Sequence, residues 1–385
     1  MKTKMKMDNR IHLRSLFLLT LIAGLLVFGQ TIGQTVNSDK LGRTIVLPDI
    51  PGYKTMKCDF HMHTVLSDGS VWPDIRVEEA LRDGLDAISI TDHLEYQPHK
   101  NDIPHPDRNR SYQLALQKAK NQNLIVINGA EFTRGMPPGH LNAIFLDDAN
   151  KLLTDDVMEG FREAIKQDAF VFWNHPHWTS QKQDGMAELT DMHQKLIKDG
   201  LINGIEIVNS KTYSDEAFQI AIDNNLTILG TSDIHGLIEW QYKLSEGEHR
   251  PLTLIFAEEK TEEAIKEGLV NRRTAVYFDN TLVGKSEFLV PLIQNSLNIK
   301  KAEYRGRSTV LSAYVENLSD VDFILENQSD FTLHSHAGII TINAHSTTLI
   351  QIKTLERLPN FNLQLKVLNA FVAPKEHPEI ILEIL

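Results

Sequence analysis

Cysteine is almost absent from this sequence: Cys58 is the single cysteine among 385 residues. One cysteine cannot form an intrachain disulfide, so a disulfide-stabilised framework is excluded. The stability of the chain must therefore come from its hydrophobic core and from any metal that it binds. Cys58 stands in an apolar run at residues 56–60, which predicts a buried strand residue and argues against a catalytic thiol.

Repeats, low-complexity linkers and long disorder-prone segments are also missing. Hydrophobic residues make up 42% of the chain, which is enough for a sizeable core and for two domains. Basic residues are in the minority, with 39 Lys and Arg against 51 Asp and Glu, so the formal net charge is −12. An acidic surface repels nucleic acid and anionic membranes at long range, which argues against a nucleic-acid partner.

The N-terminal segment departs from this acidic balance. Five basic residues precede or flank the start of an uncharged apolar run at residues 16–28, and small and polar residues follow at 29–34. This order is typical of a secretory signal peptide, and the run is short for a membrane span; an uncleaved anchor is the alternative. Cleavage after residue 34 would remove five basic residues and one acidic residue, which lowers the formal charge from −12 by four to −16. We expect an exported protein, periplasmic or secreted, without stable membrane insertion after cleavage.

The pattern between residues 54 and 280 alternates between short β-rich runs and stretches with the apolar spacing of helices. This alternation predicts an α/β domain with a mostly parallel sheet. At this length a closed or nearly closed β/α barrel is the natural architecture. The predicted strands are residues 56–61, 87–91, 124–129, 142–146, 169–173, 204–208, 227–230 and 252–256.

The last stretch, about residues 290–385, has short alternating runs separated by turn-forming residues and shows no helical period. This pattern predicts a small all-β, sandwich-like domain. The sequence therefore predicts three parts: a signal peptide at 1–34, an α/β domain at 35–290 and an all-β accessory domain at 291–385. We expect the accessory domain to carry no catalytic residue.

Histidines and acids gather where the predicted strands end. In an extended strand His61 and His63 point to the same side, and Asp68 follows in the next loop. A single His-x-His pair is weak evidence for a metal site. Four more groups follow later strands: Asp92 with His93, Glu131 with His140 nine residues on, His175 with His177, and Asp233 with His235.

The coincidence of these five groups carries more weight than any one of them. All fall at the carboxyl ends of predicted parallel strands, where barrel enzymes place their active sites. Burying so many polar side chains without a metal would be costly, so we predict a multinuclear metal centre. Nitrogen and oxygen ligands suit Mn, Zn or Fe. Two close divalent ions lower the pKa of a bridging water to about 7, which makes a hydroxide available for in-line attack on a phosphate ester.

The same residues resemble the motifs of the PHP (polymerase and histidinol phosphatase) domain superfamily, in the family's order. The resemblance covers roughly residues 55–280 and rests on these motifs: His61-Met62-His63 with Ser67-Asp68-Gly69, Thr91-Asp92-His93, Gly129-Ala130-Glu131, Asn174-His175-Pro176 and Ser232-Asp233-Ile234-His235. It implies a distorted (β/α)7 barrel and a trinuclear centre, hence two or three divalent ions.

The resemblance also implies a ligand set for each ion. The first ion would be held by His61, His63, Glu131 and Asp233, the second by Glu131, His140 and His175, and the third by Asp68, His93 and His235. Glu131 would bridge the first two ions. The spacing of His140 from Glu131 varies in the family, so His105 and His177 are alternatives to it.

The activity implied is that of a phosphoric ester hydrolase, a phosphodiesterase or phosphatase acting on a small-molecule ester. The signal peptide and the accessory domain resemble those of exported bacterial phosphodiesterases that act on small alkyl phosphate diesters. Glu131 and Asp233 are the catalytic candidates among the ligands. Arg134, three residues past Glu131, is a candidate for gripping the phosphate, or else a solvated surface charge.

Two other classes compete with this interpretation. An amidohydrolase or a TatD-like nuclease also uses a His-x-His pair, a Glu and later His and Asp ligands. Asp68, His93 and His235 argue against both, because they supply a third ion that those families lack. A periplasmic metal- or sugar-binding protein would show no turnover of phosphate esters, and a purely structural metal site would be closed by protein ligands.

The N-terminal pattern generates the first testable prediction. Mature protein recovered from the native cell envelope should begin near Gln34 or Thr35, because cleavage follows the small and polar residues. N-terminal sequencing or intact mass measures this directly. An intact Met1 on the exported protein would contradict cleavage.

Overall fold

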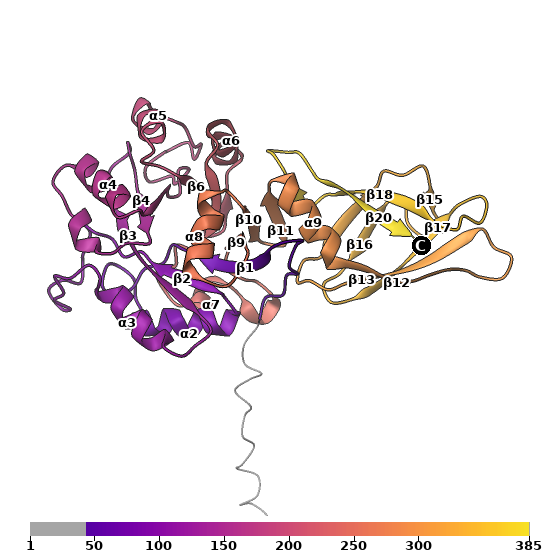
Figure 1. Cartoon of the computed structure of the whole chain (residues 1–385), viewed down its shortest axis with the longest axis horizontal. Helices are drawn as coiled ribbons and strands as arrows, with labels where there is room; N and C mark the ends of the chain where they lie inside the picture. Colours follow the sequence, from indigo (N-terminus) through magenta and orange to yellow (C-terminus); the bar gives the residue numbers. More distant parts are fainter. Residues whose placement is uncertain (1–43, 385) are drawn as a thin grey trace, which may run out of the picture. The chain divides into compact units, whose positions relative to one another are not determined.

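The computed structural model of the protein describes residues 44–384. The predicted signal peptide at residues 1–34 lies outside this range. An α/β part is followed by an antiparallel all-β part (Figure 1). Across the described residues, no helix combines the length and the apolar character needed to cross a membrane.

The α/β part consists of a curved sheet with helices packed around it (Figure 1). Its strands are β1 (Lys54–Asp59), β2 (Ala87–Ile90), β3 (Ile125–Phe132), β4 (Leu141–Ile144), β5 (Phe170–Trp173), β6 (Gly204–Asn209), β7 (Thr212–Tyr213), β8 (Thr227–Thr231), β9 (Leu252–Ala257), β10 (Thr274–Phe278) and β11 (Thr281–Gly284). Its helices are α2 (Pro73–Asp83), α3 (Arg110–Ala119), α4 (Val157–Lys166), α5 (Asp191–Lys198), α6 (Asp215–Asn224), α7 (Ile238–Gln241), α8 (Glu262–Val270) and α9 (Ser286–Ser296). Each of the eight predicted strands corresponds to one of these.

The sheet is mixed, and this corrects the prediction of a mostly parallel sheet. The pairs β1–β2, β2–β3, β5–β6 and β6–β8 are parallel, whereas β3–β4, β4–β5, β1–β9 and β9–β10 are antiparallel. Residues 133–140 between β3 and β4 contain no helical crossover, so β4 returns antiparallel to β3. β8 pairs with β6 alone among the described strands, and the sheet forms a half-barrel. The predicted α/β class is confirmed.

The all-β part confirms the predicted change of architecture. Its strands are β12 (Leu297–Tyr304), β13 (Val310–Asn317), β14 (Phe323–Asn327), β15 (Thr332–Leu333), β16 (Ile339–Ile342), β17 (Thr347–Lys353), β18 (Phe361–Val367), β19 (Ala370–Phe371) and β20 (Glu379–Ile384). Two antiparallel four-stranded sheets form, in the orders β12-β13-β17-β15 and β16-β14-β18-β20. Along β20, buried Ile380, Leu382 and Ile384 alternate with exposed residues, as expected for one face on a core.

The two parts share a sheet and a core. β19 pairs in parallel with β11, and the Tyr277 hydroxyl donates to the backbone oxygen of Asp320 at 3.1 Å. The largest hydrophobic cluster includes Leu289 from α9 together with Phe323 from β14. Residue 290, the predicted boundary, lies inside α9, and the first strand of the all-β part begins six residues after Pro291 at Leu297.

Cys58 lies within β1 and is fully buried in a hydrophobic cluster. Burial raises the pKa of its thiol well above the ordinary value. This confirms the prediction of a buried strand residue.

Arg250 is a fully buried cation close to the carboxyl end of β1. Its guanidinium contacts Asp83 Oδ2 at 2.7 Å and Asp59 Oδ2 at 3.3 Å. A buried ion pair contributes little net stability when intact, but removing one member leaves the other charge buried without compensation.

We therefore expect Arg250→Met to lower the free energy of unfolding by about 3–5 kcal/mol in a denaturant titration. The control is Lys54→Met, which removes an exposed ion pair with Asp49 and should change stability little, since solvent screens such pairs. Equal losses in the two variants would contradict the role given to the buried cation.

Candidate metal centre

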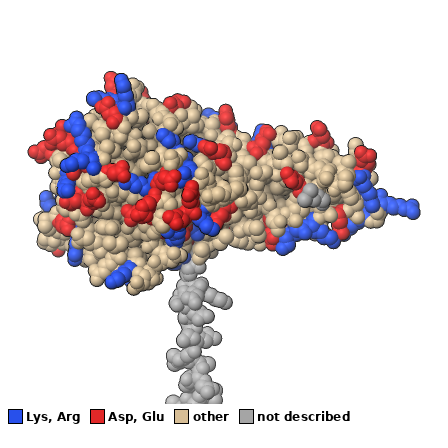
Figure 2. Space-filling view, in the orientation of Figure 1, with Lys and Arg blue, Asp and Glu red and all other residues tan. Residues whose placement is uncertain are grey.

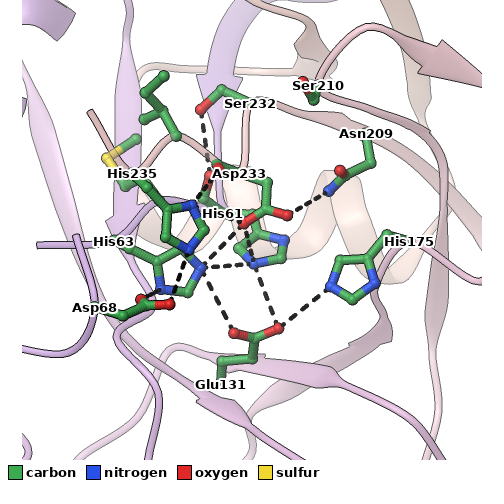
Figure 3. Close-up of polar contacts among 12 residues, drawn as sticks. His61, His63, Asp68, Glu131, His175, Asn209, Ser210, Ser232, Asp233 and His235 are labelled. Atoms are coloured by element: carbon green, nitrogen blue, oxygen red, sulfur yellow. Dashed lines mark hydrogen bonds and ion pairs between the residues drawn. The ribbon is translucent and has the colours of Figure 1, made fainter. Parts of the chain in front are cut away.

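Two buried histidines directly follow β1. His61 and His63 have no exposed surface, and their Nε2 atoms lie 3.1 Å apart. The backbone N–H of His63 donates to the oxygen of Ile234 at 3.0 Å, which brings the end of β1 beside the segment after β8. This contact places Asp233 against both rings, with Oδ1 at 3.2 Å from Nε2 of His61 and 3.1 Å from Nε2 of His63 (Figure 3).

Glu131, near the end of β3, lies at the centre of the cluster. Oε1 is 3.5 Å from Nε2 of His61, 3.1 Å from Nδ1 of His140 and 3.6 Å from Nε2 of His175. Oε2 is 3.5 Å from Nε2 of His63 and 2.6 Å from Nδ1 of His93. One carboxylate therefore contacts imidazoles that arrive from four different segments of the sheet, as a bridging ligand must.

Asp68 organises the more open side of the cluster. Its Oδ2 lies 3.5 Å from Nε2 of His93 and 3.3 Å from Nε2 of His235. The side chain of His235 is 40% exposed, whereas Glu131 is buried. This difference identifies the Asp68 side as the one that solvent reaches.

Two residues of the cluster have unusual backbone conformations. His175 has φ 27° and Asp233 has φ 50°, in a region that side-chain-bearing residues rarely adopt. Such conformations persist where surrounding contacts impose them, and they gather at functional sites. Here His175 is aimed at Glu131, and Asp233 is aimed at the two histidines after β1 (Figure 3).

The structure brings all nine predicted metal ligands together. Potential ligand atoms lie within 4.8 Å of one another in four groups: His63, Asp68, His93 and His235; His61, His63 and Asp233; His61, Glu131 and His175; and His93, Glu131 and His140. Oε2 of Glu131 faces imidazole nitrogens, at 2.6 Å from Nδ1 of His93 and 3.5 Å from Nε2 of His63, so a buried carboxylate oxygen meets two groups that are themselves metal ligands by type. The donor set of imidazole and carboxylate fits divalent Mn, Zn or Fe.

The charges of the cluster are strongly coupled. Burial works to raise the pKa of the Glu131 carboxyl, but positive charge on His93 and His61 outweighs it and holds this pKa well below its ordinary value. Burial, with His235 and His93, lowers the pKa of His63 to about 4. Burial also opposes a proton on His93, yet Glu131 and Asp68 raise its pKa to about 10. Metal ions entering the cluster would have to displace protons from such imidazoles.

Three other predicted candidates lie outside these groups. His105 contacts the backbone oxygens of Ile103 and Leu66, and Nε2 of His177 lies 2.8 Å from Oγ1 of Thr212. The geometry therefore favours His140 over both alternatives. Arg134 is engaged elsewhere, with Nε 2.9 Å from Oε1 of Glu95.

The sequence interpretation missed the residues that orient the ligands. Glu206 accepts from His61 at 2.7 Å, Asn174 donates to Oε1 of Glu131 at 2.8 Å, and Thr133 Oγ1 lies 2.7 Å from Nδ1 of His93. Asn174 stands directly before His175 in a recognised motif. The sequence also singled out Glu206, because it is the one acidic residue in the otherwise apolar predicted strand at residues 204–208.

The shared position of Glu131 generates a stoichiometry prediction. Glu131→Ala should lose two ions per chain, because it contacts the ligands of both, and Asp68→Ala should lose one. Elemental analysis of protein purified without chelator and supplied with metal during growth measures this. The wild-type protein should hold at least two ions, and fewer than one would contradict the metal centre.

Comparison with known proteins supports this interpretation of the site. The PHP domain family matches residues 59–242, and an Ig-like domain family matches residues 297–383. A two-domain protein from Bacteroides vulgatus, which contains a predicted PHP-like metal-dependent phosphoesterase, is 41% identical, with a TM-score of 0.84. The match covers 89% of this chain and 99% of that one. No curated protein matched the chain.

Two more distant structures show much weaker likeness. A protein from Bifidobacterium adolescentis, described as a metal-dependent phosphoesterase, is 17% identical, covers 48% of this chain and 90% of its own, and has a TM-score of 0.36. An amidohydrolase from Chromobacterium violaceum with bound sulfate is 14% identical, covers 47% and 88%, and has a TM-score of 0.34. On the family match and the 41% identical relative, the chain belongs to the PHP domain family and carries a C-terminal Ig-like domain.

Proposed function

We propose that this protein is a metal-dependent phosphoesterase that hydrolyses small phosphate esters, with phosphodiesters as the preferred class. The observation that carries the proposal is the position of Glu131, whose two oxygens face imidazoles of different ligand groups at 2.6 to 3.6 Å. Divalent Mn, Zn or Fe ions held by these residues would activate water and stabilise charge on phosphoryl oxygens.

The two sides of the cluster suggest how an ester would approach. His61 and His63 are fully buried, whereas His235 reaches solvent. Trp178, which is 42% exposed, has its ring 5.1 Å from that of His175 and 5.6 Å from that of His140. We expect the phosphoryl group to enter from the exposed side and the organic group of the ester to contact Trp178.

The side-chain hydroxyls next to the cluster favour a single displacement. Thr64 and Ser67 donate to Asp92 at 2.6 and 2.7 Å, and Ser232 donates to Asp59 at 2.6 Å. Each of these hydroxyls donates its hydrogen to a structural carboxylate, so none of them is paired with a base that could activate it as a nucleophile. The same contacts occupy both carboxylate oxygens of Asp92.

Thr133 is the hydroxyl that could compete as a nucleophile, because it contacts Nδ1 of His93. Nδ1 of His93 also lies 2.6 Å from Oε2 of Glu131, and its Nε2 faces Asp68. An imidazole committed on both sides to carboxylates is a poor base for Thr133. The proposal is therefore direct hydrolysis without a phosphoenzyme.

The surface charge and the N-terminal sequence bear on the partners and the location of the protein. On the face drawn in Figure 2, acidic and basic side chains of the α/β part are interspersed, and the formal net charge is −12. A small molecule suits this surface better than nucleic acid does. We also propose export to the periplasm or outside, which rests on the sequence of residues 1–34.

A substrate panel tests the function directly. Metal-free protein reloaded with Mn, Zn, Co or Fe should hydrolyse nitrophenyl diesters faster than mono- or triesters. His61→Ala and Asp233→Ala should each lower kcat by several orders of magnitude, because metal-assisted activation is lost. Arg134→Ala should act mainly on KM if it grips the phosphate, and on neither constant if it only binds Glu95. Absence of turnover in the metal-loaded wild type, with every ester, would contradict the function.

The stereochemistry of the reaction tests the mechanism. One displacement inverts a chiral phosphorus centre, so we expect inversion and no trapped phosphoenzyme. Thr133→Val should leave this inversion unchanged. Retention of configuration, or a phosphoenzyme that Thr133→Val abolishes, would rule out the single displacement.

A further inference from the structure

Glu206 is a fully buried carboxylate that none of the proposed ligand sets contains. It lies in β6 between Ile205 and Ile207, which pack into a hydrophobic cluster. The pairing of β6 with β8 shifts register between Glu206 and Val208. Such irregularities re-aim side chains next to functional sites, and here Glu206 turns away from the apolar cluster toward the histidines.

Both oxygens of Glu206 are fully engaged. Oε1 lies 2.7 Å from Nδ1 of His61 and accepts from Oγ1 of Thr231 at 2.6 Å. Oε2 accepts from the backbone N–H of His175 at 2.7 Å and from Nδ2 of Asn209 at 3.0 Å. Each oxygen therefore has two partners.

The contact with His61 fixes which nitrogen of that ring faces the cluster. An imidazole that donates its Nδ1–H to a carboxylate keeps the lone pair on Nε2. Nε2 of His61 is the atom that lies against His63, Asp233 and Glu131. Glu206 thereby holds His61 in the tautomer that can bind a metal.

The two partners of Oε2 extend this influence to other ligands. The backbone of His175 is held at φ 27°, and Glu206 accepts its N–H. Asn209 also donates to Oδ2 of Asp233 at 3.3 Å (Figure 3). One side chain thus contacts His61, the backbone that carries His175, and the amide that restrains Asp233.

We infer that Glu206 is a positioning residue that orients His61, His175 and Asp233 as ligands and so couples the two ligand sets that share Glu131. The inference rests on the metal centre of the proposed function and not on the substrate. It predicts that the affinity for metal depends on a residue that does not itself bind metal.

The test is a metal titration of the full-length, chelator-treated variant Glu206→Gln. An amide has one acceptor oxygen and adds N–H donors, so it cannot accept from all four partners. We expect the dissociation constant for Mn or Co to rise roughly 10- to 100-fold, with a changed Co absorption spectrum. The matched control is Asp83→Asn, which alters a buried carboxylate that binds Arg250 and touches none of the ligands. It should lower stability and leave metal affinity unchanged.

A milder variant guards against a failure of Glu206→Gln to fold. Asn209→Ala removes the link between Glu206 and Asp233 and should weaken metal binding by a smaller factor. Wild-type affinity and spectrum in Glu206→Gln would overturn the inference, and so would wild-type affinity in Asn209→Ala where Glu206→Gln does not fold. A wild type that binds metal but hydrolyses no ester would contradict the proposed function alone, because the titration does not depend on turnover.

Discussion

A single buried carboxylate among five imidazoles is the constraint on which the rest of the centre depends. Ring nitrogens of His61, His63, His93, His140 and His175 all lie within 2.6 to 3.6 Å of the Glu131 oxygens. A buried negative charge is unfavourable unless positive charge or hydrogen bonds compensate it. Protons on the imidazoles compensate it in part, but metal ions would compensate the carboxylates and occupy the imidazole lone pairs together. Burial and ligand geometry therefore favour the same occupant.

The half-barrel explains why these side chains meet. β1, β2, β3, β5, β6 and β8 deliver residues at or just beyond their carboxyl ends, the edge where α/β enzymes place their sites. The antiparallel hairpin β3–β4 adds His140 to the ligands, because the chain returns directly to the end of β3; a helical crossover to a parallel strand would start β4 at the opposite edge of the sheet. Glu131 pairs with Asn142 across this hairpin, so His140, two residues earlier, lies beside it. The departure from a parallel barrel thus completes the ligand set.

Much of this arrangement could be predicted from the sequence because strand ends carry a local signal. His61, His63, Asp233 and His235 stand within short motifs directly after β-rich runs, and the structure brings them together. Strand direction has no comparable signal, so the mixed sheet was missed. Glu206 was missed because a lone acid in an apolar strand specifies no partner, and its four contacts come from distant segments. The ion pair of Arg134 with Glu95 likewise depends on a loop conformation that spacing does not reveal.

The central claim is that the nine clustered side chains form a multinuclear metal centre. The most direct measurement is anomalous X-ray diffraction from crystals of the Mn-loaded protein, recorded above and below the Mn absorption edge. The account predicts two or three peaks, with one beside His61, His63 and Asp233, another beside His140 and His175, and Glu131 in contact with both. Loaded crystals without a peak at these residues, or with a single ion that Glu131 does not contact, would contradict it.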